Sequence, residues 1–170
     1  RVCGPALTVS CRAGDNLMIH YALTIAEPGD VLVVDFKGMV EAGPWGDVLT
    51  AAAIARGIAG LVIDGCVRDA VTITALGFPV FSRGTNMKGT TKVMPGLAAA
   101  PIVCAGVPVA PGDIVVGDDD GVVIVPREKA AAVLAAAHAR EAKEDAFRRD
   151  LAAGKTTVEL LHLEPYLQAA

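Results

Sequence analysis

Two continuous apolar runs organise the first half of the chain. Residues 31–35 (Val-Leu-Val-Val-Asp) and 60–64 (Gly-Leu-Val-Ile-Asp) are rich in β-branched residues and show little alternation. Such runs are typical of strands that are covered on both faces. Between them, the alanine-rich residues 47–56 have helical spacing, and Gly57 provides a stop signal. The pattern therefore predicts a strand–helix–strand unit.

The segments around this unit predict further strands and short helices. Asp15 and Asn16 precede apolar residues at helical spacing, as helix-capping residues do, and a Pro-Gly-Asp sequence at 28–30 ends that helix. The other elements that we expect here are a strand over 1–9, a loop over 38–46, a short helix from Asp69 to Gly77, a strand over 79–82 and a loop over 83–97.

The second half of the chain predicts a β region followed by helices. Four short apolar segments separated by Gly, Pro and Asp turns indicate a compact β-barrel or sandwich, at 101–104, 107–109, 114–116 and 122–125. A stretch from Glu128 to about Leu151 contains no Gly or Pro and predicts a long helix, and a final helix is expected near 158–167. No repeat or linker is visible, so we expect one domain over 1–170 with a helical extension from about 127.

Composition narrows the possible partners. With 170 residues, of which 53% are hydrophobic and 20% charged, the chain can bury one sizeable core. A net charge of −4 offers no basic surface for nucleic acid, and no apolar run approaches the roughly 18 to 20 residues that span a bilayer. The four cysteines form no Cys-x-x-Cys pair and lie mostly in apolar contexts, which favours reduced buried thiols and a cytoplasmic location.

Candidate chemistry is concentrated where the second apolar run ends. Arg68 and Asp69 follow this run, and the helix that begins at Asp47 precedes the same run. A helix N-terminus attracts carboxylates, and a carboxylate oxygen suits Mg²⁺. The set could therefore hold an anionic substrate and a divalent metal ion together. Alternatively, Arg68 and Asp69 are a surface ion pair or a cap of the following helix, and Asp47 is simply an N-cap.

Other polar residues have ordinary structural explanations. The sequence Asp-Asp-Asp-Gly at 118–121 lacks the spacing of a calcium loop and favours a β-turn. Periodicity places Glu141 and Glu144 on the charged part of the long helix, where pairs with nearby Arg and Lys are expected. A solvated or packing role is also the simpler interpretation, against a role in ligand binding or catalysis, for Lys88, Lys92, His20, His138 and His162.

Several motifs together resemble a known family. They are Asp-Asn-Leu-Met-Ile-His at 15–20, Pro-Gly-Asp-Val-Leu-Val-Val-Asp at 28–35, Gly-Asp-Val-Leu at 46–49, Asp-Gly-Cys-Val-Arg-Asp at 64–69, and Pro-Gly-Asp at 111–113 with the acidic turn at 118–121. The chain resembles the 4-hydroxy-4-methyl-2-oxoglutarate and 4-carboxy-4-hydroxy-2-oxoadipate aldolases. These are class II pyruvate aldolases, grouped with the regulators of ribonuclease E activity, and the resemblance covers nearly the whole chain.

The resemblance implies a fold and an assembly. The fold would be an α/β sandwich around a small β-barrel, related to swivelling phosphohistidine domains. The assembly would be a homotrimer or homohexamer with active sites between subunits. The family usually carries an N-terminal helical segment, which we expect to be missing here.

The resemblance also implies roles for individual residues. Asp69 would be the ligand of a divalent metal ion, Mg²⁺ or Mn²⁺, and Arg68 would contact the pyruvyl oxygen. Asp47 would orient a catalytic water. Glu144, or its neighbour Glu141, would reach a neighbouring subunit's site as a second water-orienting carboxylate. Backbone amides that would hold the pyruvyl carboxylate lie in Gly46, Asp47, Val48 and Leu49.

The activity that this resemblance implies is retro-aldol cleavage of a 4-hydroxy-2-oxo-dicarboxylate or tricarboxylate to pyruvate and a second oxoacid, with oxaloacetate decarboxylation as a side activity. Two alternatives remain open from sequence. One is a non-enzymatic regulator that binds ribonuclease E, and Asp47 and the helix carrying Glu144 argue against it. The other is a dedicated oxaloacetate decarboxylase, which would form the same enolate.

Overall fold

The structure, a computed structural model, describes residues 1–167. The chain divides into two compact units, Arg1–Arg127 and Glu128–Ala170. The sequence predicts a single domain with a helical extension from about residue 127, and this remains a prediction. Each unit has its own secondary structure.

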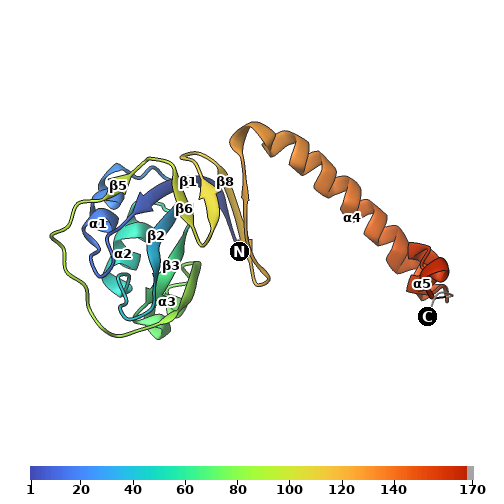
Figure 1. Ribbon diagram of the computed structural model, residues 1–170, viewed down its shortest axis with the longest axis horizontal. Coiled ribbons are helices and arrows are strands. Elements are labelled where there is room, and N and C mark those ends of the chain that lie inside the picture. The colour runs from blue at the N-terminus through green and yellow to red at the C-terminus, as the bar shows by residue number, and fades with distance from the viewer. Residues whose placement is uncertain (168–170) are drawn as a thin grey trace. The chain divides into compact units, whose positions relative to one another are not determined.

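A mixed β-sheet forms the centre of the first unit (Figure 1). Its strands lie in the order β4-β3-β2-β1-β8-β9, and β5 also pairs with β1. The first four are parallel, whereas β8 and β9 form an antiparallel hairpin. The strands are β1 (Val2–Ser10), β2 (Val31–Met39), β3 (Gly60–Val67), β4 (Val80–Thr85), β5 (Leu97–Ala98), β8 (Ile114–Asp118) and β9 (Gly121–Val125), with a separate hairpin of β6 (Ile102–Cys104) and β7 (Val107–Val109).

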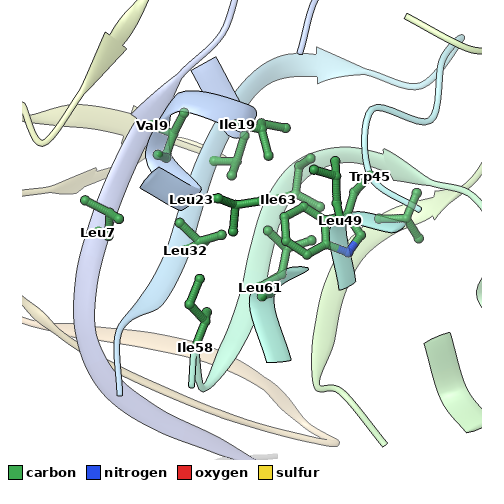
Figure 2. Close-up of a cluster of buried hydrophobic side chains, with 14 of the residues drawn as sticks. Leu7, Val9, Ile19, Leu23, Leu32, Trp45, Leu49, Ile58, Leu61 and Ile63 are labelled. Carbon is green, nitrogen blue, oxygen red and sulfur yellow. The ribbon is translucent and has the colours of Figure 1, made fainter. Parts of the chain in front are cut away.

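Two hydrophobic clusters pack against opposite faces of this sheet. One contains Leu32, Leu61 and Trp45 together with apolar residues of α1 (Leu17–Ile25), α2 (Asp47–Ala55) and α3 (Ala70–Ala75), as Figure 2 shows in part. The other contains Val31 and Val33 with residues of the β6–β7 hairpin. Neighbouring residues of a strand point to opposite faces, so both faces of β2 are buried. The continuous apolar runs are thereby explained, and the predicted α/β class is confirmed.

The second unit is helical. The turn η1 (Arg127–Lys129) leads into α4 (Ala130–Ala152), and two short helices follow, α5 (Thr157–Leu161) and α6 (Glu164–Leu167). The prediction of one helix over 158–167 is wrong. His162 adopts a left-handed conformation, with φ of 55° and ψ of 47°, and this ends α5 before Pro165 is reached. Among the described residues, none of the helices is long and apolar enough to cross a membrane.

The start of one loop differs from its prediction, whereas the prediction of buried thiols is confirmed for three of the four cysteines. The loop expected from residue 38 begins later, because β2 continues to Met39. Cys11, Cys66 and Cys104 are buried free thiols, as expected, whereas Cys3 is exposed. Burial is the main reason that the pKa of Cys11 is raised to about 12 and that of Cys104 to about 11. Both thiols are therefore protonated at neutral pH and are poor nucleophiles.

Candidate active site at the amino terminus of α2

Asp69 lies between β3 and α3, at the carboxyl end of a parallel strand. Its backbone is left-handed, with φ of 57°, a conformation that aspartate tolerates better than most residues. Asp69 occupies the N-cap position of α3, yet its side chain makes no capping hydrogen bond. Its Oδ2 instead accepts a hydrogen bond of 3.2 Å from the backbone N–H of Asp47. The simple interpretation of Asp69 as a cap of the following helix is therefore wrong.

The first turn of α2 approaches Asp69 through its backbone. Gly46 is the N-cap residue and Asp47 is the first residue of the helix, so Asp47 is not the N-cap. The Asp47 Oδ1 accepts a hydrogen bond of 2.8 Å from the N–H of Val48. Because the first N–H groups of a helix have no partner within the helix, this turn presents donors and a partial positive charge. Leu49 is buried and anchors the turn to the core.

Gly46 allows the close approach of these two segments. A Cβ at this position would lie 2.4 Å from Oδ2 of Asp69 and 3.0 Å from Nε of Arg68. Contacts under about 3 Å do not occur for real Cβ atoms, so a side chain here would displace the Asp69 carboxylate and would also press on Arg68. Glycine at this position therefore leaves space for the present arrangement of Asp69 and Arg68, and backbone conformation is not the reason, since its φ of −148° is open to other residues.

Arg68 connects the two sides of the site. Its backbone N–H donates to Trp45 O at 2.8 Å, and its Nη1 donates to Gly43 O at 2.9 Å. Its Nε lies 3.6 Å from Oδ2 of Asp69. About a third of each side chain remains exposed, 33% for Arg68 and 38% for Asp69, so both can meet a ligand.

A hollow of about 290 Å³ opens beside this pair. It lies at the carboxyl ends of β3 and β4, the edge of a parallel sheet at which ligands usually bind. The backbone N–H of Asn86 donates to Val67 O at 2.8 Å, and this bond holds the residues after β4 beside the end of β3. The residues that line the hollow are Arg68, Asp69, Ala70, Val71, Thr85, Asn86 and Met87.

The donor set is compatible with a weakly held hard cation. Within residues 1–167, no three His, Cys, Asp or Glu side chains gather as a metal cage. Mg²⁺ nevertheless commonly binds through one or two carboxylates and keeps several waters. Asp69 has one oxygen engaged by Asp47, and in the described part of the chain no hydrogen bond reaches its Oδ1. Asp69 could therefore supply a carboxylate oxygen, with substrate and water providing the rest.

Glu144 belongs to the second unit, on α4. It is bonded to Arg140 Nε at 2.8 Å and lies 4.0 Å from Arg148 Nη1, which are the i,i+4 pairs that its spacing predicts. Glu141 lies 3.7 Å from His138 Nδ1. All of these side chains are exposed. The role of Glu144 or Glu141 in a neighbouring subunit's site stays a prediction.

The first unit contains further polar candidates. Asp118 and Gly121 close the β8–β9 turn, in which Asp120 N–H donates to Asp118 Oδ1 at 3.0 Å, so the β-turn prediction is confirmed. Lys88 and Lys92 are exposed in the loop that follows β4. Burial lowers the pKa of His20, and the charge of Lys92 lowers it further. His20 is therefore neutral at physiological pH.

Asn16 is a buried residue that the sequence pattern assigned to a helix cap. In the structure it occupies the N-cap position of α1 without making a side-chain cap. Its Nδ2 donates instead to Pro44 O at 2.7 Å, two residues before Gly46. A polar pair before an apolar helix signals a cap, and nothing in the local pattern points to a contact 28 residues away.

This fold and this site define a family. The family model described as RraA-like, Aldolase/RraA, matches residues 1–124, and the chain belongs to this family. The expected resemblance is thereby confirmed. A curated relative from Halalkalibacterium halodurans, named "Putative 4-hydroxy-4-methyl-2-oxoglutarate aldolase", is 43% identical over 149 residues, which are 88% of this chain and 71% of the relative.

Solved structures agree with this assignment. An uncharacterized protein from Pseudomonas syringae pv. tomato is 33% identical, with a TM-score of 0.86 over 95% of this chain and 75% of the other. Streptomyces coelicolor RraAS2, described as an unusual member of the RNase ES inhibitor RraA family, is 36% identical. Its TM-score is 0.79, over 86% of this chain and 76% of the other. The family thus includes proteins named as aldolases and proteins named as inhibitors.

Proposed function

We propose that the protein catalyses divalent-metal-dependent retro-aldol cleavage of a 4-hydroxy-2-oxo-dicarboxylate or tricarboxylate, releasing pyruvate and a second oxoacid. Decarboxylation of oxaloacetate would be a side activity. The observation that carries this proposal is that the Asp69 carboxylate and the Arg68 guanidinium line one hollow, while the N–H of Asp47, in the first turn of α2, donates to Oδ2 of Asp69. The 43% identity with a relative named as such an aldolase supports it.

The role that we propose for each group follows from its chemistry. The N–H groups of Asp47, Val48 and Leu49 bind the pyruvyl carboxylate, because a helix N-terminus carries partial positive charge. On binding, the carboxylate replaces the present acceptors of two of these groups, which are Oδ2 of Asp69 for Asp47 and Oδ1 of Asp47 for Val48. Arg68 donates to the 2-oxo oxygen, and Asp69 holds the divalent cation. When bound, that cation supplies Lewis-acid stabilisation of negative charge on the pyruvyl fragment.

In the cleavage step, the bond between C3 and C4 of the substrate breaks. The C4 hydroxyl loses its proton to a water held by Asp47, and C4 becomes the carbonyl carbon of the departing oxoacid. The electron pair of the broken bond moves onto the pyruvyl fragment, and the resulting enolate oxygen accepts a hydrogen bond from Arg68. The water then returns a proton to C3 and yields pyruvate.

Oxaloacetate decarboxylation needs the same groups. Loss of carbon dioxide also leaves an enolate of pyruvate, so Arg68 serves both reactions. A dedicated oxaloacetate decarboxylase is therefore the second enzymatic candidate, distinguished by its substrate range and not by its machinery.

A non-enzymatic regulator of ribonuclease E is the candidate from another class. The similarity to an RNase ES inhibitor family member favours it. The aldolase proposal is preferred because Asp47 carries a second carboxylate at the site, which a surface for protein binding does not require. We further propose a cytoplasmic homotrimer or homohexamer in which Glu144 completes a neighbouring site.

The test is a pyruvate-release assay over a panel of 4-hydroxy-2-oxoacids and oxaloacetate. It is run with Mg²⁺, with Mn²⁺ and with chelator, and the oligomeric state is measured by light scattering. Release from a 4-hydroxy-2-oxoacid that stops with chelator supports the proposal. Release from oxaloacetate alone favours the decarboxylase. An absence of pyruvate from every substrate, together with inhibition of ribonuclease E, favours the regulator.

A further inference from the structure

Asn16 is a polar residue sealed inside the first unit. Its exposed fraction is 1%, and its Nδ2 donates a hydrogen bond of 2.7 Å to the backbone oxygen of Pro44. Its Oδ1 is buried and has no partner among the described residues. Leaving a buried acceptor without a partner destabilises the folded state, and an apolar residue at this position would avoid that cost. The benefit of asparagine here therefore lies in the bond to Pro44.

The loop that contains Pro44 leads directly into α2. Its carbonyl groups are held from two parts of the chain. Arg68 binds the oxygens of Gly43 and Trp45, at 2.9 and 2.8 Å, and Asn16 binds the oxygen of Pro44 between them. Because three successive carbonyls are fixed, the path of the backbone into Gly46 is fixed as well.

Asn16 is itself firmly anchored. Its backbone N–H donates to Thr91 O at 3.0 Å. The adjacent carboxylate of Asp15 accepts hydrogen bonds from Leu17 N at 2.9 Å, from Val93 N at 2.7 Å and from Thr91 Oγ1 at 2.7 Å. The side chain of Asn16 therefore projects from a backbone that is held by hydrogen bonds on both sides of it.

We propose that Asn16 is a positioning residue for the amino terminus of α2. It holds the first N–H groups of that helix where they meet the substrate carboxylate, opposite Arg68 and Asp69. This inference rests on the proposed function for the identity of the ligand, but the geometry that it describes does not. Loss of the Pro44 bond should loosen residues 43–49 and weaken binding of a pyruvate-like anion.

The experiment compares Asn16→Ala with a matched control, Thr8→Ala. Thr8 is also fully buried, and its Oγ1 also donates to a single backbone oxygen, that of Ala100 at 2.6 Å. Thr8 has no role in the site. Both variants therefore lose one buried side-chain bond to the backbone, and only Asn16→Ala loses a bond to the loop before α2.

Two measurements are made on the full chain with Mg²⁺: calorimetric binding of oxalate, an analogue of the pyruvate enolate, and hydrogen exchange of residues 43–49. For Asn16→Ala we expect oxalate affinity to fall by roughly 10- to 100-fold, the scale of a misplaced binding group. We expect faster exchange over 43–49 only in that variant. If it does not fold, Asn16→Leu, which has a similar volume and no hydrogen-bond donor, is measured instead.

The outcomes separate this inference from the proposed function. Equal oxalate affinity and equal exchange in Asn16→Ala and Thr8→Ala would overturn the positioning role. Faster exchange over 43–49 in the Asn16 variant alone supports that role even if the wild-type protein neither binds oxalate nor releases pyruvate. A wild-type protein that neither binds oxalate nor releases pyruvate would by itself overturn the proposed function.

Discussion

The backbone N–H of Asp47 donates a hydrogen bond to Oδ2 of Asp69, at 3.2 Å and across 22 residues of sequence. This bond joins the start of α2 to the carboxyl end of β3. A carboxylate and a helix N-terminus attract each other, so the pair is stable without a ligand. The same attraction would recruit a substrate carboxylate, which could then share these donors.

Asp69→Ala should abolish metal-dependent pyruvate release. The variant loses the one carboxylate that is proposed to hold the cation, and a half-exposed loop side chain contributes little to packing. Asp119→Ala, in the exposed β8–β9 turn, is the control for loss of a surface carboxylate. Initial rates with Mg²⁺ and thermal melts would be compared. Wild-type activity of Asp69→Ala after chelator treatment would exclude the metal assignment.

Arg68→Lys should lower kcat severely. A planar guanidinium can bind Gly43 O and an enolate oxygen at the same time, whereas an ammonium is a mobile point charge. Steady-state kinetics would separate the two parameters. A rise in KM with unchanged kcat would show that Arg68 binds substrate and transition state equally, and would remove its role in stabilising the enolate.

Asp47→Asn should leave the fold nearly unchanged and reduce kcat by about 100-fold or more, the scale of a general acid–base group. The structure places Asp47 at the first helical position, where loss of its charge costs only about 0.3–1 kcal/mol. Parallel melts and retro-aldol rates measure both effects. Turnover close to that of the wild type would remove Asp47 from the mechanism.

Gly46→Ala should inactivate the protein by steric displacement. The new Cβ would meet Oδ2 of Asp69 at 2.4 Å, so the carboxylate must move away from its present position, and it would meet Nε of Arg68 at 3.0 Å. Gly89→Ala, whose Cβ would have open space within 4 Å, is the matched control. Pyruvate release and oxalate binding should fall in the first variant alone. Equal activity of the two variants would show that the close approach at Gly46 is not needed.

Ionisation of Asp15 should make the free energy of unfolding depend on pH in the acid range. Burial raises the pKa of Asp15, but hydrogen bonds from Val93 N, Leu17 N, Thr91 Oγ1 and Met94 N outweigh it and lower the pKa from 3.8 to about 2. The folded state therefore favours the ionised form. Its contribution to stability is complete above pH 3.8 and is lost as the pH falls towards 2.

Urea unfolding of the wild type and of Asp15→Asn between pH 6 and pH 2 tests this expectation. Asparagine cannot accept the same set of bonds, so the variant should be less stable at pH 6. The difference in free energy of unfolding should shrink between about pH 4 and pH 2. A difference that stays constant over this range would show that ionisation of Asp15 does not stabilise the fold.

The pattern of apolar residues was enough to predict the strand–helix–strand unit and the position of Arg68 and Asp69 after its second strand. Burial on both faces of a sheet leaves a continuous apolar run, and Gly57 marks the end of α2. Both features depend on neighbouring residues, so they can be predicted from a sequence window of a few residues. The final helix was one exception, because a left-handed residue at His162 has no such local signature.

The contacts within the site depend on how distant segments pack together. Whether Asp69 caps α3 or accepts a bond from Asp47 depends on where α2 comes to lie, and the space that requires Gly46 exists only after both segments have packed. Asn16 shows the same limit, because its local pattern predicts a cap while its side chain reaches Pro44. Hydrophobic periodicity records which side of an element is buried. It does not predict which distant backbone atom a buried polar side chain will contact, and at this site those contacts position the candidate catalytic groups.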